Sequence, residues 1–364
     1  AALAGFGEAG PATAIGHPRR ASAACAAFVN GTAAHGEDYD DTFEGGPVHA
    51  GAVVVPAVLA AAELEGANGS SVLRGMAVGV EILCRLSLVV PKAVHASGFH
   101  PTAVFGAPAA AAAVASTLRL AQSGLRAALL GRAGFRGPRT VFEGTHGLFH
   151  GFARTREGNY GALLDGFGEK WVTTTLAFKP YPCGTMIQPY IDCARRLRER
   201  VSPGDIDEIV ADVGEGTVHR LWEPLADKQR PPNGYAAKFS TPYCIAAGLL
   251  RGHVGFDAFS DDAANDPDVR GLAAKVRYRI DPANPYPREF TGHLRARLRD
   301  GSVVEERQPH LRGGAREPLT RADIEEKFRS NARAGGFDGE KAAAALEALR
   351  ALFDGAVNLE ALRG

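Results

Sequence analysis

The sequence has no excess of charge of either sign and no long hydrophobic run. Its 41 lysines and arginines are balanced by 41 aspartates and glutamates. A nucleic acid or an acidic membrane surface requires a basic excess, so we expect neither as a partner. The most apolar stretch, an alanine run from Ala107 to Ala115, is far shorter than the roughly 20 residues of a membrane span. The first ten residues lack the basic region of a signal peptide, so none is expected.

Cysteine is scarce and shows no pairing pattern. There are five cysteines, an odd number, and no two of them have a CxxC spacing. This usage favours a reduced, cytoplasmic protein. They are Cys25, Cys84, Cys183, Cys193 and Cys244. What the sequence does have is a hydrophobic fraction of 45% over 364 residues, enough for two domains or one large one.

The first part of the chain predicts helices. Residues 21–132 are rich in alanine and glycine and show little of the alternation that is typical of strands. Within them, residues 56–66 and 71–90 place apolar side chains at helical spacing. Pro56 suits a first helical turn and Gly66 suits a helix end. Because small residues let helices approach closely, we predict a large helical bundle.

Beyond Lys179 the pattern changes. One more helix is indicated between Ile187 and Leu197, where apolar residues recur at helical spacing. Residues 206–213 and 275–280 then have strand-like patterns. Alternating residues from Leu294 onward turn at Asp300-Gly301 into a second apolar pair, which is a strong hairpin signal. This part predicts an α+β domain with a mostly antiparallel sheet.

The tail returns to helical patterns. Thr320 and Asp323 resemble a capping box, and Leu346, Leu349 and Phe353 repeat at helical spacing. The predicted fold class is therefore α+β. A large all-α helical domain is formed by both chain ends, residues 1–176 and 309–364, and a smaller α+β lid domain, residues 177–308, is inserted between them.

The densest polar cluster is HGEDYDDTFEGGPVHAG, residues 35–51. On a helix, Asp38, Asp41 and Thr42 would share one face. A solvated acidic surface loop is the alternative interpretation. The cluster follows an apolar helix and ends in a glycine-rich turn, which favours a functional site.

Two further clusters carry side chains suited to chemistry. His100 precedes Pro101, a suitable first helical residue, and the exposed N–H groups of such a helix start favour an anion nearby. In FKPYPCGT, two prolines stiffen the loop after Lys179 and hold this lysine at the junction of the predicted domains, where sites commonly lie. A capping histidine and a surface lysine are the alternatives. Cys183 has no adjacent base, so we interpret it as a packing residue.

Two metal-dependent alternatives fit parts of the acidic cluster. The run Asp40 to Glu44 matches the short DDxx(D/E) pattern that binds magnesium–diphosphate in terpenoid synthases. The second metal motif of those enzymes is not evident, and their fold has no place for the mixed domain. A zinc or iron site of His35, His49 and Asp38 would lack an HxxxH or HExxH anchor. We therefore predict no metal.

In their order along the chain, these clusters resemble the MmgE/PrpD family, whose members include 2-methylcitrate dehydratases, cis-aconitate decarboxylases and iminodisuccinate epimerases. The resemblance covers about Val29 to Ala332. The matching stretches are FVNGTAAHGEDYDDTF, VHAGAVVVPAVLAAAE, LRGMAVGVEILCRLS, GFHPTAVFGAPAAAAA, GFRGPRTVFEGTHGLF, FKPYPCGT with IDCARRL, and AAKFSTPYCIAAGLLRG.

The resemblance implies an all-α domain with an inserted lid, an active site in the cleft, a homodimer and no cofactor. It also implies a di- or tricarboxylate substrate. Carried over residue by residue, the site would hold Asp38, His49, His100 and Lys179 as catalytic residues and Thr42 as a substrate-binding residue. We add Ser240 and Tyr243, from the KFSTPYC stretch, as substrate-binding residues.

These residue types suit proton removal next to a carboxylate, which needs a base and cations over the developing charge. The leading hypothesis is a lyase that dehydrates a hydroxy acid in the manner of 2-methylcitrate dehydratase; an epimerase is the first alternative. Gly184 stands where some members, notably decarboxylases, have histidine, which disfavours decarboxylation. A Lys-x-x-His-x-Gly segment found in the family is missing between Leu120 and Ala121. That absence motivates a further hypothesis, a catalytically inactive homologue with a binding or structural role.

Overall fold

The computed structural model describes residues 9–118 and 140–364, and the chain forms two compact units. The first unit consists of Ala1–His35, Asp40–Leu176 and Arg321–Gly364, and the second of Gly36–Tyr39 and Ala177–Thr320. Each unit is described by itself. The junction between Leu120 and Ala121, where the family segment is missing, lies outside the described residues.

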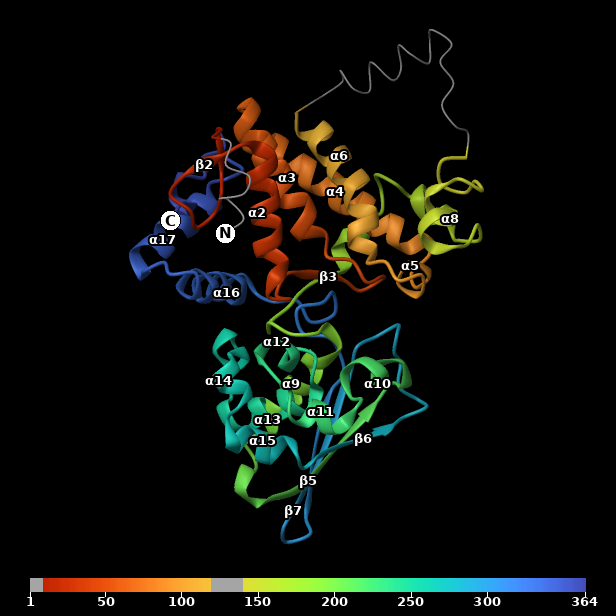
Figure 1. Cartoon of the computed structure of the whole chain (residues 1–364), viewed down its shortest axis with the longest axis vertical. Coiled ribbons are helices and arrows are strands. Elements are labelled where there is room, and N and C mark those ends of the chain that lie inside the picture. Colours follow the sequence, from red (N-terminus) through yellow and green to blue (C-terminus); the bar gives the residue numbers. More distant parts are fainter. Residues whose placement is uncertain (1–8, 119–139) are drawn as a thin grey trace. The chain divides into compact units, whose positions relative to one another are not determined.

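The first unit is mainly helical (Figure 1). Its helices are α2 (Ala23–Gly36), α3 (Ala50–Glu65), α4 (Gly69–Val89), α5 (Ala93–Ala96), α6 (Pro101–Thr117), α8 (Leu148–Ala153), α16 (Arg321–Ala334) and α17 (Gly339–Arg350). Its strands are short: β1 (Ala12–Thr13), β2 (Arg20–Ala21) and β3 (Asp41–Phe43), while β4 (Leu176–Phe178) begins at the last residue of the middle segment. β1 and β2 pair antiparallel.

Helices α3, α4 and α6 pack against one another and form the centre of this unit (Figure 1). Their contact is close because α4 offers glycines to α6. A Cβ added to Gly75 would lie 1.8 Å from Thr117 Oγ1, and one added to Gly79 would lie 2.5 Å from Ala113 Cβ. Neither distance is possible unless neighbouring atoms shift. The predicted close approach of helices through small residues is therefore confirmed at this crossing.

A buried ion pair on α4 organises the segment that precedes β4. Arg85 Nε lies 2.6 Å from Glu81 Oε1, and both side chains are buried. Arg85 also donates to the carbonyls of Ala162 and Lys170, at 3.0 and 2.7 Å. Glu81 in turn accepts the N–H of Thr173 at 3.1 Å. The pair thus satisfies its own charges and the backbone groups of an irregular stretch at the same time.

Helix α3 begins earlier than the sequence predicts. Pro56 lies inside it and not in its first turn, whereas Gly66 ends it with a left-handed φ of 64° as expected. A proline inside a helix removes one N–H donor and is ordinarily unfavourable. Here the helix gains its first turn from Asp41, whose carboxylate accepts the N–H groups of Ala50 and Gly51. That contact is not visible from local spacing.

The second unit joins a small sheet to several helices (Figure 1). Its strands are β5 (Ile206–Val213), β6 (Val276–Ile280), β7 (Gly292–Leu298) and β8 (Val303–Gln308). Its helices are α9 (Gln188–Arg198), α10 (Glu215–Leu221), α11 (Leu225–Gln229), α12 (Gly234–Ala237), α13 (Thr241–Arg251), α14 (Asp261–Ala264) and α15 (Pro267–Ala273). The sheet order is β6-β5-β7-β8; β5 pairs parallel with β6, and the other pairs are antiparallel.

One face of this sheet is the core of the second unit. Ile209 and Ala211 of β5 and Leu294 and Ala296 of β7 are fully buried. Helix α9 packs on β7 and β8, and α13 packs on β6. The predicted strands, the hairpin at Gly301 and the mostly antiparallel sheet are confirmed, and the mixture of helix and sheet agrees with an α+β class. None of the described helices has the length and apolar character needed to cross a membrane.

Candidate functional site

Lys179 and Asp38 form a buried ion pair in the second unit. Lys179 Nζ donates to Asp38 Oδ1 at 2.7 Å and to the Asp38 carbonyl oxygen at 3.0 Å. The lysine side chain is only 2% exposed. Asp38 has a φ of 53°, in the left-handed region that residues other than glycine rarely adopt. The lysine therefore holds both the carboxylate and an unusual backbone conformation.

A second buried lysine, Lys238, binds Glu37, the residue before Asp38, in the same manner. Lys238 Nζ donates to Glu37 Oε2 at 2.6 Å and to the Glu37 carbonyl oxygen at 2.9 Å. The ammonium also lies 5.7 and 5.3 Å from the ring centres of Phe256 and Phe259, within cation–π range. Two buried cations thus bind consecutive residues of the short segment Gly36–Tyr39.

Ser240 and Tyr243 have other contacts in this unit. Ser240 Oγ accepts the N–H of Tyr243 at 3.1 Å at the start of α13 and donates to the carbonyl of Lys228. Tyr243 donates its hydroxyl to the carbonyl of Ala258 at 2.6 Å, and burial raises the pKa of its phenol. Both residues are completely buried. Their contacts stabilise the start of α13 and bind the carbonyl groups of Lys228 and Ala258. Their role in substrate binding stays a prediction.

In the first unit, Asp41 connects the acidic run with α3. Its carboxylate accepts the N–H of Gly51 at 2.8 Å and that of Ala50 at 3.1 Å, at the positive end of the helix. A Cβ at Gly51 would lie 2.3 Å from Asp41 Oδ1, so the contact requires glycine. Burial and the negative charge of Asp40 raise the pKa of Asp41 to about 6. Thr42, the next residue, is buried in β3.

His49 and His100 precede α3 and α6, and Thr102 links them. The N–H of His49 donates to Thr102 Oγ1 at 2.9 Å, and the N–H of Thr102 donates to His100 Nδ1 at 3.2 Å. His49 Nδ1 lies 2.7 Å from the carbonyl oxygen of Asp41. Since a carbonyl only accepts, His49 carries its proton on Nδ1; since His100 Nδ1 accepts, a neutral His100 carries its proton on Nε2. At Nε2, His49 is therefore a hydrogen-bond acceptor and a neutral His100 is a hydrogen-bond donor.

These histidines belong to a larger cluster of the first unit. The ring centres of His35 and His49 are 4.8 Å apart, those of His49 and His100 5.7 Å, and those of His95 and His100 5.1 Å. Asp40 contacts two of them, with 3.0 Å to His35 Nδ1 and 3.5 Å to His49 Nδ1. We refer to His35, Asp40 and His49 as the His/Asp group. Such a concentration of imidazole and carboxylate groups can bind anions, transfer protons or hold a cation.

Two expectations from the sequence need correction. The acidic run is not helical: Asp38 has a left-handed φ, and Asp41 and Thr42 lie in strand β3. Asp38, Asp41 and Thr42 therefore share no helical face. The carboxylate that accompanies His35 and His49 is that of Asp40, because Asp38 belongs to the second unit and pairs there with Lys179.

Comparison with known proteins supplies the family. The family model described as the MmgE/PrpD N-terminal domain matches residues 1–123, and that of the MmgE/PrpD C-terminal domain matches residues 181–352. This chain belongs to the MmgE/PrpD family. The resemblance predicted from the motifs is confirmed.

Three curated relatives of this MmgE/PrpD chain are named cis-aconitate decarboxylase. Cis-aconitate decarboxylase of Mus musculus is 28% identical over 349 residues, covering 84% of this chain and 71% of the relative. The Homo sapiens protein of the same name is 28% identical, with 84% and 72% covered. Cis-aconitate decarboxylase of Aspergillus terreus is 25% identical over 395 residues, with 89% and 78% covered.

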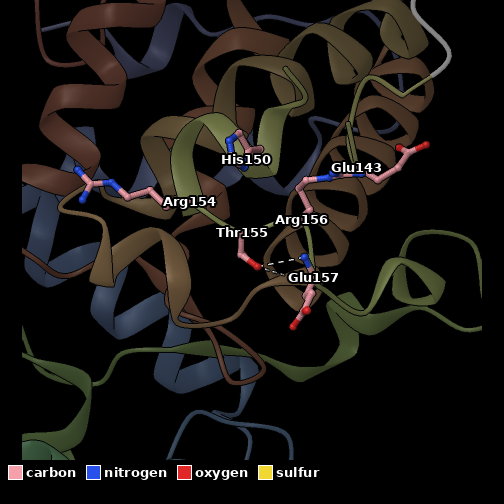
Figure 2. A pocket seen from close by; sticks show the side chains of 6 residues that line it. All are labelled: Glu143, His150, Arg154, Thr155, Arg156 and Glu157. Carbon is pink, nitrogen blue, oxygen red and sulfur yellow. Dashed lines mark hydrogen bonds between the residues drawn. The ribbon is translucent and has the colours of Figure 1, made fainter. Parts of the chain in front are cut away.

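A surface cavity of about 670 Å³ lies elsewhere in the first unit of this MmgE/PrpD chain (Figure 2). It is lined by Glu143, His150, Arg154, Thr155, Arg156 and Glu157. Figure 2 shows Thr155 bonded to the neighbouring Glu157, whose N–H it accepts at 3.0 Å. The charges around the cavity are of both signs, and none of the predicted site residues lines it.

The five cysteines of this MmgE/PrpD chain are all free, in agreement with the reduced chain that the sequence predicts, and all are buried. Burial raises the pKa of the Cys183 thiol well above its usual value, and hydrogen bonding to Cys244 adds to the effect. Burial likewise raises the pKa of Cys193 to about 12. A nucleophilic cysteine needs a lowered pKa, so Cys183 has the properties of the packing residue that the sequence indicated.

Sequence reasoning did not select Lys238, Asp40 or Thr102. Lys238 lies two residues before Ser240 in the same AAKFST motif, and Asp40 lies in the acidic run. Both residues lie in motifs that the sequence analysis singled out. Their burial and their ion pairs arise from tertiary contacts, which the sequence pattern does not show. Thr102 offered one signal: it directly follows His-Pro at a predicted helix start, where a hydroxyl reaches neighbouring backbone groups.

Proposed function

We propose that this chain is a cofactor-independent lyase that transfers a proton next to a carboxylate of a small di- or tricarboxylic acid. The observation that carries the proposal is the buried Lys179–Asp38 pair, with its 2.7 Å contact and the left-handed φ of Asp38. A base beside a buried cation is what removal of such a proton requires. Family membership and the names of the relatives also support it.

We assign roles to five residues. Lys179 stabilises negative charge that develops on the substrate, and Asp38 is the base or orients it. His100 donates from Nε2 to a substrate carboxylate, and His49 accepts at Nε2, as their hydrogen bonds to Thr102 and Asp41 indicate. Thr42 contributes a hydroxyl to substrate binding. The proposal does not depend on Ser240 or Tyr243.

Dehydration in the manner of 2-methylcitrate dehydratase is our first candidate for the net reaction. Decarboxylation is the second, because three curated relatives are named cis-aconitate decarboxylase. Against it stands Gly184, at the position where some members of the family, notably decarboxylases, have histidine. Epimerisation shares the proton abstraction and returns the proton to the opposite face of the carbon.

The experiment that separates these reactions is proton exchange in D₂O followed by NMR. The panel contains 2-methylcitrate, citrate, cis-aconitate and an aspartate-derived imino acid. Exchange with alkene formation identifies a dehydratase, loss of CO₂ with deuterium incorporation identifies a decarboxylase, and inversion alone identifies an epimerase. Folded protein that exchanges no proton on any of these acids contradicts the proposal and favours the inactive homologue.

Two substitutions test the site assignment on the acid that turns over. Lys179→Ala and His100→Ala should each lower turnover about 100-fold or more, the scale of losing one positioned charge-stabilising group. Lys170→Ala, which removes an exposed lysine of the first unit, should leave turnover unchanged. Steady-state kinetics on variants with normal circular dichroism provide the measurement. Turnover close to that of the wild type in either variant would exclude the residue from the site.

A further inference from the structure

We propose that Asp40 is a positioning residue that stabilises the doubly protonated form of His49, so that His49 can donate a proton from Nε2 to the substrate. The inference rests on the proposed function, in which His49 contacts the substrate, and adds one residue to that site. Asp40 contacts no substrate in this account and acts only through the His49 ring. Both residues belong to the first unit.

Two consecutive acidic residues approach the same nitrogen of His49. The Asp41 carbonyl oxygen lies 2.7 Å from His49 Nδ1, which fixes the ring and places the proton of a neutral ring on Nδ1. Asp40 Oδ1 lies 3.5 Å from the same nitrogen. That distance is long for a hydrogen bond but short for an ion pair. The carbonyl therefore sets the tautomer, whereas the Asp40 carboxylate contributes mainly its charge.

The contact between Asp40 and His49 is shielded from water. The side chain of Asp40 is 5% exposed and that of His49 is 12% exposed, so solvent screens the attraction between a carboxylate and an imidazolium only weakly. Burial, and then the negative charge of Asp40, raise the pKa of Asp41 to about 6. The same charge acts on His49 with the opposite sign, because it favours a positively charged ring beside it.

His35 orients the Asp40 carboxylate. His35 Nδ1 lies 3.0 Å from Asp40 Oδ2, so that one carboxylate oxygen faces each of the two histidines. The ring centres of His35 and His49 are 4.8 Å apart. Two imidazolium rings at this distance would repel each other, and the carboxylate that faces both offsets the repulsion. The His/Asp group is therefore arranged to hold positive charge on its histidines.

Such a histidine supplies a proton donor, which dehydration needs. A base removes the proton from the carbon next to the carboxylate, and the C–H electron pair forms the alkene. The C–O bond then breaks with its electron pair on oxygen, and this oxygen takes the Nε2 proton of His49 and leaves as water. His49 becomes neutral and keeps its Nδ1 proton on the Asp41 carbonyl. The base returns its proton to solvent and His49 recovers one from solvent, so the enzyme is unchanged.

Ionisable groups from three elements face His49 and bear on its pH dependence. Asp40 and Asp41 precede it along the chain, His35 comes from α2, and His100 comes from the start of α6. Of these, the two aspartates bring negative charge. Asp40→Asn removes one charge and keeps the size of the side chain and an oxygen that can accept the N–H of His35. It therefore tests the charge and not the packing.

The direct test is NMR of the full chain without substrate. Protein is labelled with ¹⁵N-histidine, and the His49 ring is assigned by comparison with His49→Gln. In Asp40→Asn the midpoint of the His49 titration should fall by about one pH unit, because an opposite charge this close favours the protonated ring. Glu65→Gln is the matched control. It removes an exposed carboxylate at the far end of α3, roughly 24 Å along the helix axis, and should leave the midpoint unchanged.

Kinetics on the acid that turns over supply the second readout. Asp40→Asn should lower kcat about tenfold or more and change KM less than about threefold, and the loss of activity at high pH should begin at a lower pH. A His49 midpoint that stays in place in Asp40→Asn, or that moves equally in Glu65→Gln, would overturn the proposal. Turnover of Asp40→Asn equal to that of the wild type would also overturn it. Wild-type protein that converts none of the acids contradicts the proposed function, and the NMR titration still decides whether Asp40 stabilises the protonated ring.

Discussion

At the scale of single residues, Asp212 shows how the second unit handles a buried charge. Its carboxylate lies 2.7 Å from His293 Nδ1, 2.7 Å from Arg295 and 2.9 Å from Arg279. Burial alone would raise its pKa. Hydrogen bonding to Arg295 and the positive charges of Arg295, His293 and Arg279 outweigh burial and hold the pKa of Asp212 below its usual value.

Asp212→Asn should therefore destabilise the protein in a pH-dependent way. Since the folded-state pKa is depressed, the stabilisation is complete above the unfolded-state pKa of about 3.9 and is lost as pH falls through the folded-state pKa. We expect the substitution to lower the free energy of unfolding by about 2 kcal/mol at pH 7. The difference should shrink below about pH 4. Urea unfolding of the wild type and of Asp212→Asn from pH 3 to 7 measures this difference in the free energy of unfolding. A constant difference over that range, or an equal effect of Asp262→Asn, would contradict this account.

The residue scale also shows what could be predicted for the candidate site. His49, His100 and Lys179 were selected because they stand in recognisable motifs next to helix starts or prolines. Which carboxylate pairs with which cation was not predictable. Asp38 and Asp40 are two residues apart, yet one contacts Lys179 and the other contacts His35. That difference depends on the left-handed backbone of Asp38, which no spacing rule reports.

At the scale of elements, the α4–α6 crossing depends on glycine. Gly75→Ala should lower the free energy of unfolding by roughly 1–3 kcal/mol, because the new methyl group meets Thr117 Oγ1 and the carbonyl of Ala113. Gly151→Ala, inside α8 with open space around the added carbon, is the control. It should be neutral or stabilise by up to about 1 kcal/mol, since alanine has the higher helix propensity. Thermal and urea unfolding compare the two; a Gly75→Ala protein as stable as the wild type would refute the close crossing.

Elements that follow from local pattern were predicted well, and those that follow from distant contacts were not. Strand β5 and the β7–β8 hairpin show alternation and an Asp-Gly turn, and they occur where expected. The start of α3 was placed too late because Pro56 is a normal first-turn residue and local spacing cannot show the cap that Asp41 supplies. Tertiary contacts override propensity in this case.

At the scale of the whole molecule, the second unit contains four residues from far upstream in the chain. Gly36–Tyr39 belong to it, and Lys179 and Lys238 bind Asp38 and Glu37 there. In a fragment of residues 177–320 alone, Lys179 and Lys238 would lack these carboxylates. Burial of an unpaired charge is strongly destabilising, by about 3–5 kcal/mol for a broken buried pair.

Replacing both lysines with methionine should therefore change the melting temperature in opposite directions in the fragment and in the full chain. In the fragment, Lys179→Met with Lys238→Met should raise the melting temperature, because apolar side chains replace unpaired charges. In the full chain the same pair should lower it, because Asp38 loses its partner in a buried position. Thermal unfolding of the four proteins gives the comparison. Changes of the same sign in both contexts would show that the upstream segment does not stabilise the second unit.

The insertion of an α+β part between helical ends was predicted from the change in residue pattern along the sequence. The arrangement of a lid over a bundle and the homodimer stay predictions, because they depend on contacts that no local pattern encodes. The participation of residues 36–39 in the second unit could not be predicted. Their sequence reads as part of the first unit, and only the two buried lysines reveal where they belong.

The same four residues set an order of events during synthesis. Asp38 and Glu37 are separated from their lysines by 141 and 201 positions. At 5–20 residues per second, the ribosome delivers Lys179 and Lys238 on the order of ten seconds or more after the acidic segment. During that interval the two carboxylates remain hydrated. The turn of Asp38 therefore acquires its final conformation only after at least 141 further residues have been added to the chain, and contacts this distant in sequence are among the slowest to form.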